Sequence, residues 1–122
     1  MRDVLLGLEK PRTYLIQQIQ FLNPALDSSQ RKAVTSTLSQ EDLLIIHGPP
    51  RTGKTTILVE IIRKTVKLGG RVLVCSASLA TVDILMARLM ERMNNGIVRI
   101  GHSAKMDRKH VKYTLTCMVM KV

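Results

Sequence analysis

The sequence predicts an α/β fold in which a parallel sheet lies between two layers of helices, and three observations lead to this prediction. Short apolar runs at 42–48, 71–77 and 96–102 are typical of buried strands, and they alternate with segments of helical periodicity. The 122 residues include one Phe, two Tyr and no Trp, so the core must be aliphatic, which suits a parallel sheet covered by helices. A glycine-rich loop joins the first apolar run to the helix after it.

The first 26 residues leave two structures open. Residues 13–22 have helical spacing, and they form either an amphipathic helix or an extended lead-in, bracketed by Pro11 and Pro24. We expect a lead-in segment, 1–26, ahead of the domain.

The next segment, 26–40, predicts a helix that either Asp27 or Ser28 can cap. Its apolar stripe consists of Ala33, Val34 and Leu38. A strand at 42–48 follows, and residues 54–68 predict a helix of about four turns that stops at the Gly69-Gly70 pair.

The second half continues the alternation. The strand at 71–77 holds Cys75, which we expect to be a small buried residue. A helix at 81–93, whose methionines fill the core, leads to the third strand at 96–102. The tail from His110 onward is either a fourth strand or an unanchored end.

The loop that opens the helix at 54–68 carries the chemistry, because its letters, GPPRTGKT, satisfy the P-loop pattern G-x-x-x-x-G-K-[ST]. In such a loop, backbone N–H groups surround phosphate oxygens, Lys54 places its charge on the β and γ phosphates, and Thr55 offers a hydroxyl to Mg²⁺. We therefore predict ATP and Mg²⁺ as cofactors, with Lys54 and Thr55 as the catalytic side chains. The predicted nucleotide-binding residues of the loop are Gly48, Pro49, Pro50, Arg51, Thr52, Gly53, Lys54, Thr55 and Thr56.

Arg51 occupies a loop position that commonly adopts a positive φ, which glycine tolerates and most residues do not. A side chain there costs on the order of 1–2 kcal/mol. The opposing consideration is that a guanidinium beside phosphates can add a contact. We weigh the strain more heavily and predict that Arg51 weakens nucleotide binding.

The net charge of +10 indicates a polyanionic partner. Residues 1–50 carry five basic and five acidic side chains, so the whole excess lies in residues 51–122. Such a surface attracts nucleic acid or an anionic membrane face, or it is a solvated face with no partner. A basic cluster either lies along nucleic acid or forms a solvated edge; it consists of Arg99, Lys105, Arg108, Lys109 and Lys112. No apolar run approaches the length of a membrane span.

Four blocks, "LDSSQRKAV", "LLIIHGPPRTGKTT", "RVLVCSASLATVDIL" and "RIGH", together resemble the first RecA-like domain of superfamily 1B helicases. The nearest group is that of the immunoglobulin mu-binding protein helicases, with the nonsense-mediated decay helicases and senataxin more distant. The resemblance covers residues 22–105. It implies a three-layer, parallel-sheet P-loop NTPase (RecA-like) fold, here truncated, with a partial domain at 27–105 and a divergent tail at 106–122.

The resemblance also implies roles for single residues. Gln30 matches a glutamine that binds the adenine edge, whereas without the resemblance it is an exposed helix residue. Ser78 matches a contact to the backbone of single-stranded DNA or RNA. Two departures put ordinary activity in doubt: Leu79 replaces an asparagine of the family, and Arg51 replaces a glycine.

Hydrolysis requires an acidic Mg²⁺ ligand after a buried strand and a carboxylate that activates water. The family supplies them as Asp-Glu, but the acids after the loop do not follow an apolar strand; they are Glu60, Asp83, Glu91 and Asp107. We expect a nuclear or cytoplasmic fragment that binds ATP and nucleic acid but neither hydrolyses ATP nor unwinds alone. The rivals are a non-catalytic basic nucleic-acid-binding module and a small P-loop kinase, which would leave Gln30 and the "RIGH" block unexplained.

Overall fold

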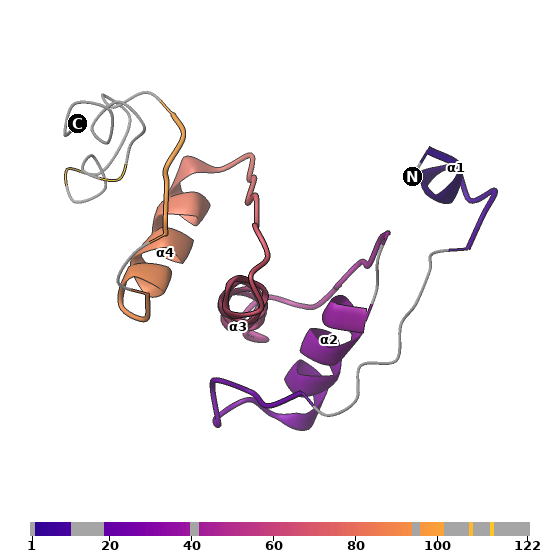
Figure 1. The fold of residues 1–122 in the computed structure, drawn as a ribbon, viewed down its shortest axis with the longest axis horizontal. Helices are drawn as coiled ribbons and strands as arrows, with labels where there is room; N and C mark the ends of the chain where they lie inside the picture. The colour runs from indigo at the N-terminus through magenta and orange to yellow at the C-terminus, as the bar shows by residue number, and fades with distance from the viewer. Residues whose placement is uncertain are drawn as a thin grey trace. The chain divides into compact units, whose positions relative to one another are not determined.

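The computed structural model describes residues 2–10, 19–39, 42–93, 96–101, 108 and 113. These residues contain four helices, which are α1 (Arg2–Leu5), α2 (Ser28–Ser39), α3 (Lys54–Lys67) and α4 (Leu79–Met90) (Figure 1). The chain divides into two units, Met1–Val72 and Leu73–Val122, and each is described by itself. No helix of the described part is both long enough and apolar enough to cross a bilayer.

Helix α2 begins with a reciprocal pair of hydrogen bonds between Asp27 and Gln30. The Gln30 N–H donates to Asp27 Oδ1 at 2.8 Å, and the Asp27 N–H donates to Gln30 Oε1 at 3.2 Å. This capping box satisfies two backbone donors at the helix start. The predicted helix is confirmed, and Asp27 rather than Ser28 is its cap.

Helix α3 ends where the two glycines predicted it would. Gly69 has φ 84°, its N–H donates to the Val66 carbonyl at 2.9 Å, and the Gly70 N–H donates to the Thr65 carbonyl at 2.9 Å. These two bonds form a Schellman motif, which requires a residue with positive φ directly after the helix. The local sequence therefore sets the length of α3.

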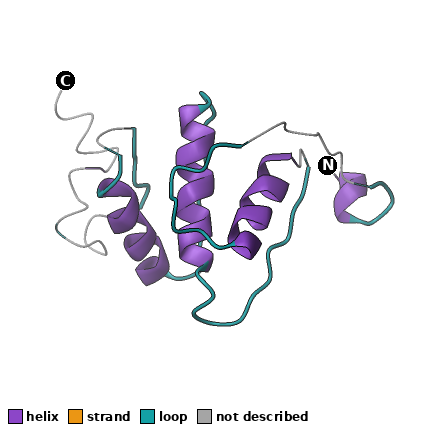
Figure 2. Cartoon of the chain, turned by 90° about the horizontal axis from the view of Figure 1, so that it is seen from below, coloured by secondary structure: helices purple, strands orange, loops and turns teal. Residues whose placement is uncertain are grey.

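Helices α2 and α3 pack side by side and form the core of the first unit (Figure 2). Leu26, Val34 and Ile57 are its buried centre. Burying a side chain of this size stabilises a fold by about 1.5–3 kcal/mol. Four partly buried residues pack against this centre: Phe21, Ala33, Leu38 and Ile61. Ala33 and Leu38 are the other two members of the predicted stripe.

Residues 20–26, here called the strap, are held against α3 by two of its polar side chains. Glu60, which is 1% exposed, accepts a hydrogen bond from the Leu22 N–H through Oε1. Lys64, one turn further along, donates to the Gln20 carbonyl. Residues 19–22 are not helical, whereas residues 13–18 of the segment with helical spacing lie outside the described residues.

Arg31 of α2 binds the C-terminal end of the strap. Its guanidinium donates to the carbonyls of Leu26 and Pro24, both at 2.9 Å, and lies 5.4 Å from the centre of the Phe21 ring. A guanidinium stacked on an aromatic ring adds a cation–π attraction. The strap is therefore tied to both helices of the first unit.

In the second unit, α4 begins two residues earlier than the predicted helix at 81–93 and buries one face. Leu85, Met86 and Leu89 are each at most 6% exposed, which agrees with the core-filling role expected of Met86. Polar residues hold the segment after the helix, because Arg99 Nη2 lies 3.0 Å from Asp83 Oδ1. Arg99 is buried, so it is neither a solvated edge residue nor free to contact nucleic acid.

The predicted sheet is absent from the described residues. The segments expected as strands at 42–48 and 71–77, and the described residues 96–101 of the third, have no ladder; the Arg99 N–H makes a single bridge to the Tyr113 carbonyl at 2.8 Å. Ile45 and Leu73 are each 80% exposed, and Cys75 is exposed rather than buried. An apolar run records a preference for burial, but a strand forms only when a neighbour supplies its hydrogen bonds.

Candidate functional site

The loop Gly48–Thr55 leads directly into α3, and two residues with positive φ shape its turn. Gly53 has φ 82° and precedes the first helical residue. Arg51 has φ 66°, and it is the one non-glycine with positive φ in the described part of the chain. The positive φ predicted for this loop position is therefore confirmed.

Hydrogen bonds within the loop hold this conformation. The Thr52 hydroxyl donates to the Pro49 carbonyl at 2.9 Å. The Lys54 ammonium donates to the carbonyls of Gly48 and Pro49, both at 2.6 Å. Lys54 therefore folds back over the start of the loop, and the third proton of its ammonium remains available.

The start of α3 presents backbone donors for which the described residues supply no acceptor. The Ile57 N–H is the first to bond back, to the Gly53 carbonyl at 3.0 Å. Within the described residues, the N–H groups of 51–56 and the Thr55 hydroxyl donate no hydrogen bond. Free N–H groups and the positive end of a helix dipole together attract anions. The residues present therefore fit a phosphate group and a hydroxyl-bound Mg²⁺.

Gln30 lies against this loop although it precedes Thr52 by 22 residues. Its Nε2 donates to the Thr52 carbonyl at 3.3 Å, and a Cβ added to Gly53 would lie 2.5 Å from the same nitrogen. An amide offers two protons and two lone pairs. After its bonds to Thr52 and Asp27, Gln30 keeps one of each for a ligand.

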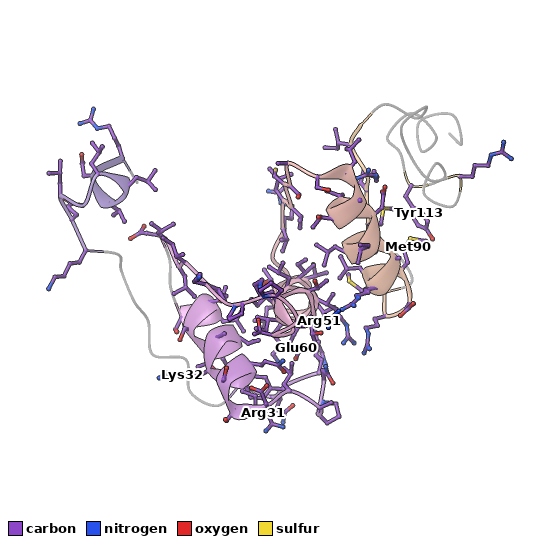
Figure 3. The ribbon with its side chains drawn as sticks, turned by 180° about the vertical axis from the view of Figure 1, so that it is seen from behind. Arg31, Lys32, Arg51, Glu60, Met90 and Tyr113 are labelled. Atoms are coloured by element: carbon purple, nitrogen blue, oxygen red, sulfur yellow. The ribbon has the colours of Figure 1, made fainter. Side chains whose placement is uncertain are left out.

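Two of the described carboxylates after the loop, those of Glu60 and Asp83, bind other groups of the protein. The Glu60 side chain is labelled on α3 in Figure 3. It lies about 9 Å along the helix axis from Lys54 and accepts a hydrogen bond from the Leu22 N–H of the strap. Asp83 pairs with Arg99, and Glu91 follows the last residue of α4 in the second unit. Asp107 lies outside the described residues.

Ser78 is the N-cap residue of α4, with φ −103° and ψ 120°. Its hydroxyl makes no capping hydrogen bond, and its N–H donates to Ser76 Oγ at 3.2 Å. Ser78 belongs to the second unit, whereas the loop and Gln30 belong to the first.

Sequence reasoning missed two contacts that shape the site. Asp27 fixes the Gln30 side chain through the capping box, and the Thr52 hydroxyl closes the loop on Pro49. The D-x-x-Q spacing could have revealed the first, because a side chain three residues after a cap reaches back to it. Nothing in the sequence distinguishes the Thr52 hydroxyl from that of Thr55 or Thr56.

Comparison with known proteins decides the family, since the AAA domain profile matches residues 25–121. The chain belongs to the AAA domain family. The match contains the loop, Gln30 and Ser78, and it implies the P-loop NTPase α/β fold that the sequence predicts.

Relatives of this AAA domain confirm the superfamily 1B helicase group. The chain is 42% identical to "DNA-binding protein SMUBP-2" of Mesocricetus auratus over 98% of its length, and 46% identical to "DNA polymerase alpha-associated DNA helicase A" of Schizosaccharomyces pombe over 75%. It is 31% identical over 98% to "Regulator of nonsense transcripts 1" of Caenorhabditis elegans. The aligned region spans 12%, 14% and 10% of these relatives, respectively.

Proposed function

We propose that this chain binds ATP with Mg²⁺ at the loop Gly48–Thr55. The observation that carries the proposal is the arrangement of Gln30, the Lys54 ammonium and the unused N–H groups of 51–56 around one helix start. The AAA domain match over these residues supports it independently.

Each group has a distinct task in the proposed complex. The N–H groups of 51–56 and the Lys54 ammonium bind phosphate oxygens, and the Thr55 hydroxyl is a ligand for Mg²⁺. The metal, when bound, shields the phosphate charges. The remaining donor and acceptor of Gln30 match the paired acceptor and donor on the adenine edge.

We further propose that the 122 residues do not hydrolyse ATP or unwind nucleic acid by themselves. Water activation needs a carboxylate at the phosphates, whereas Glu60 is buried against the strap and Asp83 is paired with Arg99. The ATP-binding region in this proposal is 27–105, with 1–26 as a lead-in and 106–122 as a tail.

Single-stranded DNA or RNA is the proposed second ligand, in the nucleus or the cytoplasm. The charge excess of residues 51–122 and the printed names of the relatives, which include a DNA-binding protein and a DNA helicase, support this proposal. Ser78 is the proposed contact to the nucleic-acid backbone, through its hydroxyl group, which makes no capping hydrogen bond. Arg99 has no part in it, because its guanidinium is buried.

Titration calorimetry with MgATP tests the binding proposal on the native chain, Lys54→Ala and the control Lys67→Ala, which removes an exposed lysine at the far end of α3. We expect saturable binding by the native chain and the control, and none by Lys54→Ala. Equal binding by all three folded proteins would refute the site.

Phosphate release, measured with and without single-stranded nucleic acid, tests the remaining proposals. We expect none in either case. Release that depends on nucleic acid and on Lys54 would show a working motor, and phosphate transfer to a small acceptor would show a kinase. Salt-sensitive nucleic-acid binding without ATP binding would show a passive basic module.

A further inference from the structure

Arg51 combines two properties whose effects on binding oppose each other. Its backbone is in the left-handed region, with φ 66°, which strains an L-residue. Its side chain is exposed, and the guanidinium makes no hydrogen bond or ion pair with a described residue. The sequence alone predicts that the strain dominates and weakens nucleotide binding.

The structure assigns the energetic cost of this strain to the folding of the chain rather than to nucleotide binding. The bonds from Thr52 Oγ1 and the Lys54 ammonium to Gly48 and Pro49 close the loop around Arg51. Gln30, which is not part of the loop, donates a hydrogen bond from Nε2 to the Thr52 carbonyl. Because the folded protein's own contacts maintain the positive φ, the strain lowers fold stability and leaves phosphate affinity unaffected.

The charge, in contrast, acts on binding. Arg51 precedes Lys54 by three residues, so their Cα atoms are at most about 11 Å apart, which is close to the screening length in physiological salt. Lys54 directs two of its three protons at loop carbonyls, whereas all five N–H donors of Arg51 are available. A guanidinium also matches the geometry of a phosphate.

We propose that Arg51 is a second cation of the phosphate site and makes the loop selective for longer polyphosphate chains. This proposal rests on the proposed function. A charge at this distance acts more strongly on a triphosphate than on a monophosphate, because the triphosphate carries more negative charge. We expect removal of the Arg51 charge to weaken ATP binding about threefold, the scale of an exposed charge pair, and to leave AMP binding unchanged.

Three substitutions separate charge from strain. Arg51→Gly removes both, Arg51→Ala removes the charge and keeps the strain, and Arg51→Lys keeps both. Dissociation constants for ATP, AMP and inorganic triphosphate are measured by calorimetry at low and high salt. We expect the glycine and alanine variants to lose the same affinity for ATP and triphosphate, Arg51→Lys to retain most of it, and the differences to shrink in high salt.

The contradicting results are specific. Tighter ATP binding by Arg51→Gly than by Arg51→Ala and the native chain would place the strain in the binding step and overturn the proposal. Equal ATP binding by all variants, with binding still lost in Lys54→Ala, would overturn the role of Arg51 alone. Absence of ATP and triphosphate binding by the folded native chain would overturn the proposed function together with it.

Discussion

Two glycines with nearly the same backbone angle allow a direct test of the contact between Gln30 and the loop. Gly53 has φ 82° and Gly69 has φ 84°. A Cβ on Gly69 would meet nothing within 4 Å, whereas a Cβ on Gly53 would lie 2.5 Å from Gln30 Nε2. An alanine at either position would therefore have the same strain from a positive φ, but only the alanine at position 53 would contact Gln30.

The expected energies follow from these contacts. Alanine at positive φ costs about 1–2 kcal/mol, and its lower entropy in the unfolded chain offsets about 0.4–1 kcal/mol of this. Gly53→Ala also displaces the Gln30 amide from the Thr52 carbonyl, which adds about 0.5–1.5 kcal/mol. We expect Gly69→Ala to destabilise by about 1 kcal/mol and Gly53→Ala by about 2 kcal/mol.

Urea unfolding, followed by the helical circular dichroism signal, measures both values. In a Gln30→Ala background the difference between the two alanine variants should disappear, because the displaced amide is absent. Equal destabilisation by Gly53→Ala and Gly69→Ala in the native background would refute the placement of Gln30 against the loop.

Three further substitutions test the supports of the two units by the same unfolding assay. Asp27→Ala removes the cap of α2 and should cost about 1 kcal/mol, while Ser29→Ala should change little; equal effects would count against the capping box. Glu60→Ala should cost about 2–3 kcal/mol, since it leaves the part-buried Leu22 N–H of the strap without its acceptor. Glu60→Gln keeps the acceptor and should stay within about 1 kcal/mol of the native chain; a larger loss for Glu60→Gln than for Glu60→Ala would contradict this role. Asp83→Ala leaves Arg99 buried without its counter-ion and should cost about 2–3 kcal/mol; an unchanged midpoint would disprove the buried pair.

The helices and the phosphate loop could be predicted because their determinants are local. Asp27 and Gln30 are three residues apart, Gly69 and Gly70 end α3 through adjacent N–H groups, and the loop is one contiguous motif. The positive φ of Arg51 could be predicted for the same reason.

The pairing of the apolar runs as strands and the burial of individual side chains are not determined locally, because both depend on contacts distant in sequence. Cys75 lies in an apolar run but is exposed, and Arg99, a member of the predicted basic cluster, is buried against Asp83. Likewise, nothing near Glu60 in the sequence indicates that its carboxylate accepts a hydrogen bond from Leu22. The type of a residue sets its preference for burial or exposure, but the residues that it contacts in the fold determine whether it is buried.

Amide hydrogen exchange at residues 51–56, measured with and without MgATP, tests most directly whether the start of α3 binds phosphate. We predict that ATP slows exchange of these N–H groups, while the Gly69 and Gly70 amides at the other end of the helix stay unchanged. Lys54→Ala should abolish the effect. Slowed exchange elsewhere in the chain, with no change at 51–56 under saturating ATP, would contradict the account.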